Sequence, residues 1–493
     1  MNRKHPHPLS SKPIQLLQAM ARDAQSSNLH RMLISARKWF SFAAATSLSV
    51  SIATLSFTAL SSGLAQAAAL QAQPTQAAPT KFVPFSEFVT SLKYAEAPDY
   101  LARPEVKISD AASFSEMRQH LIGLYSGVDV KHSYVLDAQT FDCVPIEQQP
   151  GLRGRGISTI AAPPPADFAP ASPRTKNEVV APSAKLSQFP IDAKADAFGN
   201  SLGCEAHTIP MRRITLEEMS RFKNLKEFFQ KGPNGAGQPS SPAKEVAPSV
   251  YAHKYSYTYQ NVYNHGASTN INLWRPYVYT GSNEIFSLAQ SWVIGDSWGT
   301  TQTAETGWQN YPAKYGSENP ALFIYWTADG YNATGCYNLD CGAFVQTSSS
   351  LHLGAGFSNY SLYGSTQYEI QLQYYLYAGN WWLRVGGNWV GYYPGTVYRG
   401  GELTYYSNKL EFGSESVGTT VWPAEGSGFF ANSGYGWAGY QRLIYYSNLS
   451  NASIWTGLTA ATPSPSCYTV AGPYYASTWG EYFYFGGPGG GGC

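Results

Sequence analysis

The feature that most constrains the fold of this chain is the uneven distribution of its aromatic residues. Of the 36 tyrosines and 13 tryptophans, 32 and 12 lie after residue 250. That half is rich in glycine and poor in charge, and Gly, Asn and Ser separate its alternating or aromatic runs. Clear runs are Tyr255–Tyr263, Phe286–Val293, Tyr368–Tyr377 and Gln441–Tyr446. The pattern predicts an all-β domain of two stacked antiparallel sheets, a β-sandwich.

The start of the chain has the composition of a secretory signal. Basic residues precede an apolar run of small side chains, and Ala65-Gln66-Ala67 is typical of a cleavage site. We therefore expect a signal peptide over residues 1–67 and a secreted product, either extracellular or periplasmic. The run is rich in Ala, Ser and Thr rather than Leu, which favours cleavage over a membrane anchor.

Composition divides the rest of the chain into three regions. Residues 68–230 combine helix and strand patterns, which predicts a smaller α+β domain with a low-complexity insertion at about 150–200. Residues 231–249 are rich in Gly, Pro and Ser and predict a linker. The all-β domain then takes residues 250–493.

Charge and motif content exclude several classes of function. The net charge is +1, so no strong field favours nucleic acid as a partner. The sequence has no Gly-x-Ser-x-Gly turn and no His-Glu-x-x-His motif, and the histidines after residue 250 are scattered. Six cysteines in an exported chain favour disulfides, although composition leaves their pairing open. We therefore expect no metal, no cofactor and no thiol nucleophile.

Two glutamates after residue 250 stand in surroundings unlike those of most other carboxylates. Glu305 and Glu402 each lie in a short aromatic segment that resembles a strand. Strand alternation would place Gln309 on the face of Glu305 and Tyr406 on the face of Glu402. On composition alone, both glutamates fit equally well as solvent-facing strand residues. Six other carboxylates lie in turn-like surroundings: Glu284, Glu318, Asp340, Glu411, Glu415 and Glu425.

Seven short motifs follow one another in this half of the chain. They are Ala304–Pro312, Leu322–Tyr331, Thr334–Gln346, Gly379–Leu383, Val390–Pro394, Gly400–Leu403 and Gly426–Gly428. Their order and content resemble the neprosin family of glutamic peptidases. The chain departs from the family where Tyr398-Arg399-Gly400-Gly401 replaces a hydrophobic-Trp-Gly-Gly pattern.

The resemblance implies a concanavalin-like or jelly-roll-like sandwich whose concave face carries two catalytic glutamates, here Glu305 and Glu402. It implies a secreted endopeptidase that cleaves peptides and proteins at acidic pH, with a preference for bonds after proline. Such a carboxylate pair shares a proton, so that one member activates water and the other protonates the amide. The sequence leaves open which glutamate does which.

The region before the linker also resembles the neprosin activation peptide, at Asp142–Pro150 and Ile209–Arg213. The resemblance implies an inhibitory pro-domain. Because residues 231–249 combine a flexible composition with several prolines, we hypothesise that the enzyme cleaves itself there, after a proline, to release this domain. The alternative is an ordinary N-terminal domain that stays attached. The disulfide pairing that follows the family pattern is Cys143–Cys204, Cys336–Cys341 and Cys467–Cys493.

Three aromatic or polar residues are candidates for substrate binding. Gln309 could hold water or an oxyanion, or it could be a hydrogen-bonding residue at the rim of the site. Trp308 and Tyr406 could stack on a proline ring, or they could belong to the core. A second class of function also fits the pattern, namely a carbohydrate-active or carbohydrate-binding sandwich without peptidase activity. We expect a monomer.

Overall fold

The computed structural model describes residues 81–153, 159–165, 168, 172–173, 185–186, 194–231 and 252–493. The predicted signal peptide, much of the predicted insertion and most of the predicted linker lie outside these residues. From residue 81 onward the described residues belong to one compact unit. No helix among them is both long and apolar enough to cross a membrane.

The N-terminal segment, residues 81–231, combines helices with a small antiparallel sheet. Helices α4 (Phe85–Tyr94), α5 (Ala97–Leu101) and α6 (Ala111–Tyr125) precede strands β1 (His132–Leu136), β2 (Gln139–Pro145) and β4 (Thr208–Arg212), and two short helices follow, α7 (Leu216–Met219) and α8 (Leu225–Phe229). Asn224 caps α8, because its side chain accepts a hydrogen bond from the backbone N–H of Glu227. This cap fixes where the chain turns before Lys231.

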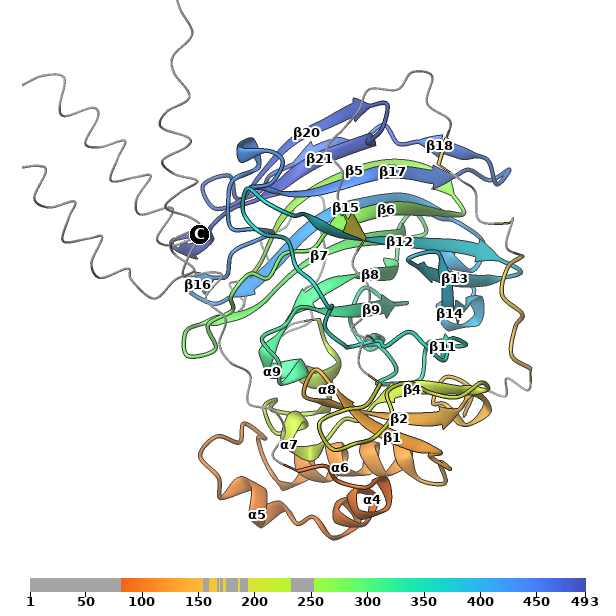
Figure 1. The fold of residues 1–493 in the computed structure, drawn as a ribbon, viewed down its shortest axis with the longest axis vertical. Helices are drawn as coiled ribbons and strands as arrows, with labels where there is room; N and C mark the ends of the chain where they lie inside the picture. Colours follow the sequence, from red (N-terminus) through yellow and green to blue (C-terminus); the bar gives the residue numbers. More distant parts are fainter. Residues whose placement is uncertain are drawn as a thin grey trace, which may run out of the picture. The chain divides into compact units, whose positions relative to one another are not determined.

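The first sheet of the C-terminal half has seven strands, all antiparallel. In spatial order they are β10 (Cys336–Tyr337), β9 (Ala321–Thr327), β8 (Gln302–Asn310), β7 (Glu284–Gly295), β15 (Ser407–Gly418), β5 (Ala252–Asn264) and β19 (Thr459–Ala461). In Figure 1, β9, β8, β7, β15 and β5 of this sheet follow one another upward through the view.

The second sheet has ten strands. The main path runs β11 (Val345–Gln346), β14 (Asn388–Pro394), β13 (Asn380–Val385), β12 (Tyr368–Tyr377), β6 (Gly266–Asn272), β17 (Gly439–Ser447), β21 (Gly480–Gly486) and β20 (Thr469–Ala476), while β18 (Ser453–Trp455) pairs with β17 and β3 (Lys185–Leu186) with β12. The predicted antiparallel β-sandwich is confirmed, and the four runs singled out in the sequence lie in β5, β7, β12 and β17.

Each sheet has an inner face toward the other sheet and an outer face away from it. Trp308 marks the inner face of the seven-stranded sheet, since its indole N–H donates to the carbonyl of Asn272 in β6 over 3.0 Å. Because side chains alternate along a strand, Glu305, Gly307 and Gln309 are on the outer face. The outer face of the seven-stranded sheet is therefore where the candidate site lies.

Three disulfides tie the chain together, in the pairs that the family resemblance implied. Cys143–Cys204 lies within the N-terminal segment, Cys336–Cys341 closes the loop after β10, and Cys467–Cys493 holds the C-terminal tail.

Candidate active site

Strand register brings two rows of residues together on the outer face of the seven-stranded sheet. Glu305 on β8 lies opposite Trp292 on β7, which lies opposite Glu411 on β15. In the next row, Gln290 has Gly307 on one side and Gly413 on the other. Neither neighbouring strand therefore places a side chain beside Gln290, which leaves room for a group to enter between β8 and β15.

The group that enters is the ammonium of Lys231. Its Nζ lies 2.6 Å from Oε2 of Glu305 and 2.7 Å from Oε2 of Glu415. All three side chains are almost completely buried. Lys231 Nζ also lies 5.2 Å from the centre of the Trp292 ring, a cation–π distance. One cation thus joins two carboxylates that come from different strands.

Each carboxylate has its own set of additional partners. Glu415 accepts a hydrogen bond from Nε2 of Gln290 at 3.0 Å, and its Oε1 lies 2.6 Å from Nδ1 of His253. Glu305 accepts hydrogen bonds from the hydroxyls of Thr303 and Tyr331, at 2.8 and 2.7 Å. Nitrogen groups therefore hold Glu415, whereas hydroxyls hold Glu305.

The ion pair changes the proton affinity of its members in opposite directions. Burial alone disfavours the charged ammonium, but Glu305 and Glu415 outweigh that cost and raise the pKa of Lys231. Burial alone would raise the pKa of the Glu415 carboxyl, but Lys231 and His253 outweigh it and lower that pKa. At neutral pH the site therefore holds a charged lysine against an ionised Glu415.

A third carboxylate, Glu411, lies in the same row without a comparable role. Burial raises its pKa to about 7, and Lys409, at 2.6 Å, counters this in part. Its place beyond Trp292 separates it from Glu305 by one strand.

The structure corrects the predicted strand position of Glu402. This residue does not lie in a strand but begins a 3-10 helix, η3 (Glu402–Thr404). The chain turns there because Arg399 and Gly400 both have positive φ angles. The carboxylate of Glu402 accepts hydrogen bonds from the N–H and the hydroxyl of Ser297. Among the described residues, no polar contact joins Glu402 to Glu305 or Lys231.

The structure also corrects the prediction for Glu415, which was placed in turn-like surroundings. Glu415 lies inside the long strand β15 and is completely buried. A sequence signal was present, since Leu410 and Phe412 alternate with Glu411 and Gly413 as expected of a strand. A second missed residue is Lys231, which the sequence placed at the start of a flexible linker.

The three candidate substrate-binding residues have different positions. Gln309 shares the outer face with Glu305, and its side chain is buried, donating to the hydroxyl of Tyr337 over 3.1 Å. Trp308 lies on the inner face, so its assignment to a substrate surface is wrong: alternation along β8 turns it into the core. Tyr406 packs against Tyr263 and Trp298, and in the described part of the chain no polar or ring contact joins it to Glu305.

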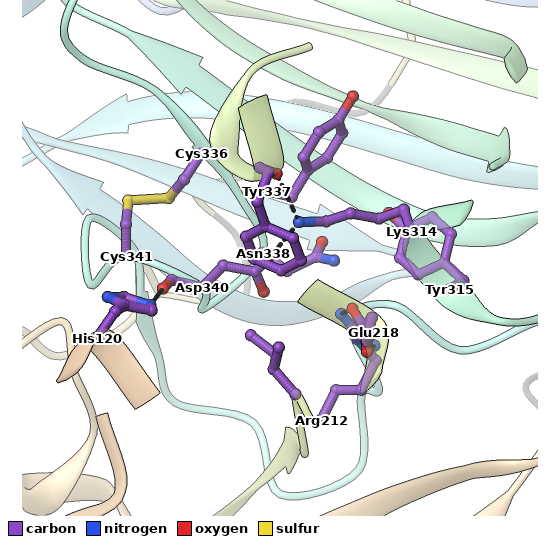
Figure 2. A network of polar contacts seen from close by, with 12 residues as sticks. His120, Arg212, Glu218, Lys314, Tyr315, Cys336, Tyr337, Asn338, Asp340 and Cys341 are labelled. Carbon is purple, nitrogen blue, oxygen red and sulfur yellow. Dashed lines mark hydrogen bonds and ion pairs between the residues drawn. A yellow bond between two sulfur atoms is a disulfide. The ribbon is translucent and has the colours of Figure 1, made fainter. Parts of the chain in front are cut away.

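The N-terminal segment covers the outer face at a second place, shown in Figure 2. Lys314, from helix α9 (Pro312–Tyr315), donates to the carbonyl of Phe228 over 3.1 Å and pairs with Asp340 at 2.7 Å. His120 of α6 reaches the carbonyl of Asp340 at 2.9 Å. Burial lowers the pKa of Lys314 in spite of Asp340. Residues just before Lys231 are thus anchored to the sandwich.

The carboxylates of this face do not assemble into a metal site. Among the described residues, no group of three or more His, Cys, Asp or Glu side chains has an arrangement that could hold a metal ion. The cation between Glu305 and Glu415 is instead an ammonium supplied by the chain itself.

Comparison with known families agrees with the motifs in the sequence. Residues 283–488 match the family model described as Neprosin. The chain carries a neprosin domain. Within this neprosin domain, Phe412-Gly413-Ser414 precedes Glu415, whereas Tyr398-Arg399-Gly400-Gly401 precedes Glu402.

Several solved structures are similar to part of the chain that carries the neprosin domain. Two are crystal structures of scytalido-glutamic peptidase, with a transition state analog inhibitor (11% identity, 48% of this chain, 98% of that chain, TM-score 0.29) and with a peptide-based transition state analog (10%, 48%, 97%, 0.27). A third is SCP-B, a member of the Eqolisin family of peptidases, with the tripeptide Ala-Ile-His (11%, 47%, 96%, 0.26). At such TM-scores these structures say nothing about the chemistry of this chain.

Proposed function

We propose that this chain is the precursor of a glutamic endopeptidase whose catalytic pair is Glu305 and Glu415. The observation that carries the proposal is the single ammonium that contacts both buried carboxylates, at 2.6 and 2.7 Å. Two carboxylates that contact one ammonium are close enough to flank one water and one amide, and each is close enough to change the pKa of the other. The neprosin domain supports a peptidase.

The hydrogen-bond partners support different roles for the two glutamates. Glu415 faces N–H groups from Gln290 and His253, which favour the ionised form, so we assign it as the general base. Glu415 takes a proton from water, and the water oxygen attacks the carbonyl carbon of the peptide. Glu305 supplies its proton first to the carbonyl oxygen, and the proton reaches the leaving nitrogen as the C–N bond breaks.

In the precursor, the N-terminal segment acts as an intramolecular inhibitor of the enzyme. Lys231 forms ion pairs with both carboxylates and takes the place where water would be activated. Lys314 donates to the carbonyl of Phe228 and so anchors the residues just before Lys231. Removal of the segment is therefore required before substrate can reach Glu305.

Activation, export and specificity complete the proposal. We place activation at self-cleavage after a proline in residues 232–249, which lie outside the described residues and immediately follow Lys231. N-terminal sequencing of the processed form tests this, since a start after another residue type would indicate a different protease. We also propose that the enzyme is secreted, that it works at acidic pH and that it cleaves after proline.

The experiment is an acid digest of a defined protein mixture by the processed enzyme, with cleavage sites read by mass spectrometry. The matched control is Glu305→Gln, which keeps the size and hydrogen bonding of the side chain. We expect cuts after proline that disappear in the variant. Cuts that persist in Glu305→Gln would contradict the catalytic pair, and release of sugar from a polysaccharide without any peptide cleavage would favour a carbohydrate-active enzyme instead.

A further inference from the structure

The outer face of the ten-stranded sheet carries a group of aromatic side chains. Tyr375, Trp382 and Tyr392 lie opposite one another on β12, β13 and β14. Trp382 lies 4.6 Å from the Tyr392 ring and 6.1 Å from the Trp389 ring. Tyr377 lies two residues beyond Tyr375 on the same face. We call these five residues the aromatic surface.

The neighbouring residue Trp381 shows which way this surface faces. Its indole N–H donates to the carbonyl of Leu403, and it belongs to the main core, whereas Trp382 packs in a separate cluster. The aromatic surface is thus on the side of its sheet that faces away from the other sheet. Glu305 and Glu415 lie on the outer face of the seven-stranded sheet, so the two sites are distinct.

A proline-rich part of the N-terminal segment covers the aromatic surface. Residues Ala161–Pro165 form neither helix nor strand and include three consecutive prolines. The backbone N–H of Ala161 donates to the hydroxyl of Tyr392 over 3.0 Å, and Pro164 is buried. Further along, the ring of Phe168 lies 4.4 Å from that of Tyr377.

The chemistry of the surface suits such a ligand. Consecutive prolines favour an extended chain with little conformational freedom to lose, and aromatic-lined surfaces with a few hydrogen-bonding groups recognise it. Tyr392 already supplies one such group to Ala161. The indole N–H of Trp382 is buried and has no hydrogen-bond partner among the described residues, which leaves one donor for a peptide carbonyl.

We propose that the aromatic surface is a second binding site, for an extended proline-rich segment of a polypeptide substrate. In the precursor, Ala161–Pro165 and Phe168 occupy it. The proposal rests on the proposed function in one respect, namely that the N-terminal segment leaves after activation. Once it leaves, the surface holds a proline-rich stretch of substrate while another part of that substrate reaches Glu305.

The test is a binding measurement that needs no catalysis. The precursor carrying Glu305→Gln is compared with the same precursor in which Pro163, Pro164, Pro165 and Phe168 are all replaced by serine. The probe is a fluorescent synthetic peptide with the sequence of residues 159–168, followed by fluorescence anisotropy. A tethered competitor acts at millimolar effective concentration, so we expect the four-serine variant to bind the probe at least about tenfold more tightly.

Two controls separate recognition from adhesion. In the four-serine variant, Trp389→Ala should weaken binding by about tenfold, whereas Trp298→Ala, an exposed tryptophan elsewhere, should leave it unchanged. A probe with its three prolines replaced by alanine should bind at least about tenfold more weakly. Circular dichroism confirms that each variant is folded.

Three results would overturn the proposal. They are equal affinity of both precursors for the probe, equal binding of the proline-free probe, and binding of xylan oligosaccharides in place of the peptide. The outcome is independent of peptidase activity, because every protein in the experiment carries Glu305→Gln. A processed wild-type enzyme without peptidase activity would refute the proposed function and leave the binding result as it stands.

Discussion

Glu402 and Glu415 lie close together in sequence and both are buried, but their surroundings differ in kind. Glu402 meets the neutral N–H and hydroxyl of Ser297 at a turn. Glu415 meets an ammonium, an imidazole and an amide inside a sheet, and it shares the ammonium with Glu305. The comparison teaches that strand register, and not the local Gly-Gly-Glu sequence, decides which carboxylate becomes the partner of Glu305.

The largest expected effect is the difference in kcat/KM between variants of these two glutamates. Glu415→Gln in the processed enzyme should lower kcat/KM by about a thousandfold, because the base that activates water is lost. Glu402→Gln should change kcat/KM by less than about threefold, since its partner is Ser297. Hydrolysis of a fluorogenic proline-containing peptide measures both variants. The reverse ranking would restore Glu402 as the catalytic partner.

The next effect concerns the pH at which Lys231 holds the site closed. Glu415 has a lowered pKa, so the stability it contributes is present above its usual value of 4.5 and is lost as the pH falls through its folded pKa. Lys231 has a raised pKa, so its contribution is present below its usual value of 10.5 and is lost as the pH rises through its folded pKa. The closed precursor should therefore be most stable between about pH 5 and pH 10.

Urea denaturation across this range measures the effect in the Glu305→Gln precursor, which cannot cleave itself and keeps the Lys231–Glu415 pair. Lys231→Met in that background should cost about 3 kcal/mol near neutral pH, where it leaves a buried carboxylate without its cation. The cost should shrink in acid, where Glu415 takes up a proton. A cost that stays the same down to strongly acidic pH would show that Lys231 stabilises the precursor by packing.

A smaller effect is expected at His253, which contacts Glu415 from β5. His253→Gln removes an interaction that lowers the pKa of Glu415, so that pKa should rise. The acid limb of the kcat/KM profile of the processed enzyme should then move to higher pH, with a loss of about tenfold at the acid end. His265→Gln is the matched control, because His265 contacts Asn451 instead. If the acid limb does not move, His253 does not control the pKa of Glu415 in the processed enzyme.

The smallest effect is expected at Ser297. Ser297→Ala removes the hydroxyl that donates to Glu402 and should destabilise the fold by about 1 kcal/mol. It should change kcat/KM by less than about twofold, as expected of a residue that serves only a structural glutamate. Peptide hydrolysis and thermal unfolding together measure it. A large loss of kcat with unchanged stability would return Glu402 to the active site.

The strands could be predicted because their signal is local. The run Tyr368–Tyr377 is strand β12, and the aromatic runs in β5, β7 and β17 were visible in the same way. Side-chain alternation is set within a few residues, so composition reveals it. The same rule, applied to Glu305, correctly put Gln309 on its face and should have put Trp308 on the other.

The site could be predicted only in part because its partners are distant in sequence. Glu305 was predicted from the family resemblance together with its aromatic surroundings, whereas the serines and glycines around Glu415 are typical of turns as well as of a crowded strand. The position of Lys231 depends on how α8 is anchored by Lys314. The Gly- and Pro-rich composition of the predicted linker does not predict this contact. Register between β7, β8 and β15 is the missing information.

The most direct measurement of the pairing is a double-mutant cycle on the stability of the Glu305→Gln precursor near neutral pH. One cycle combines Lys231→Met with Glu415→Gln, and a matched cycle combines Lys231→Met with Glu402→Gln. If Lys231 closes a site formed with Glu415, the first cycle should give a coupling of about 2 kcal/mol and the second should be additive. Coupling of Lys231 to Glu402, with none to Glu415, would contradict the proposed catalytic pair.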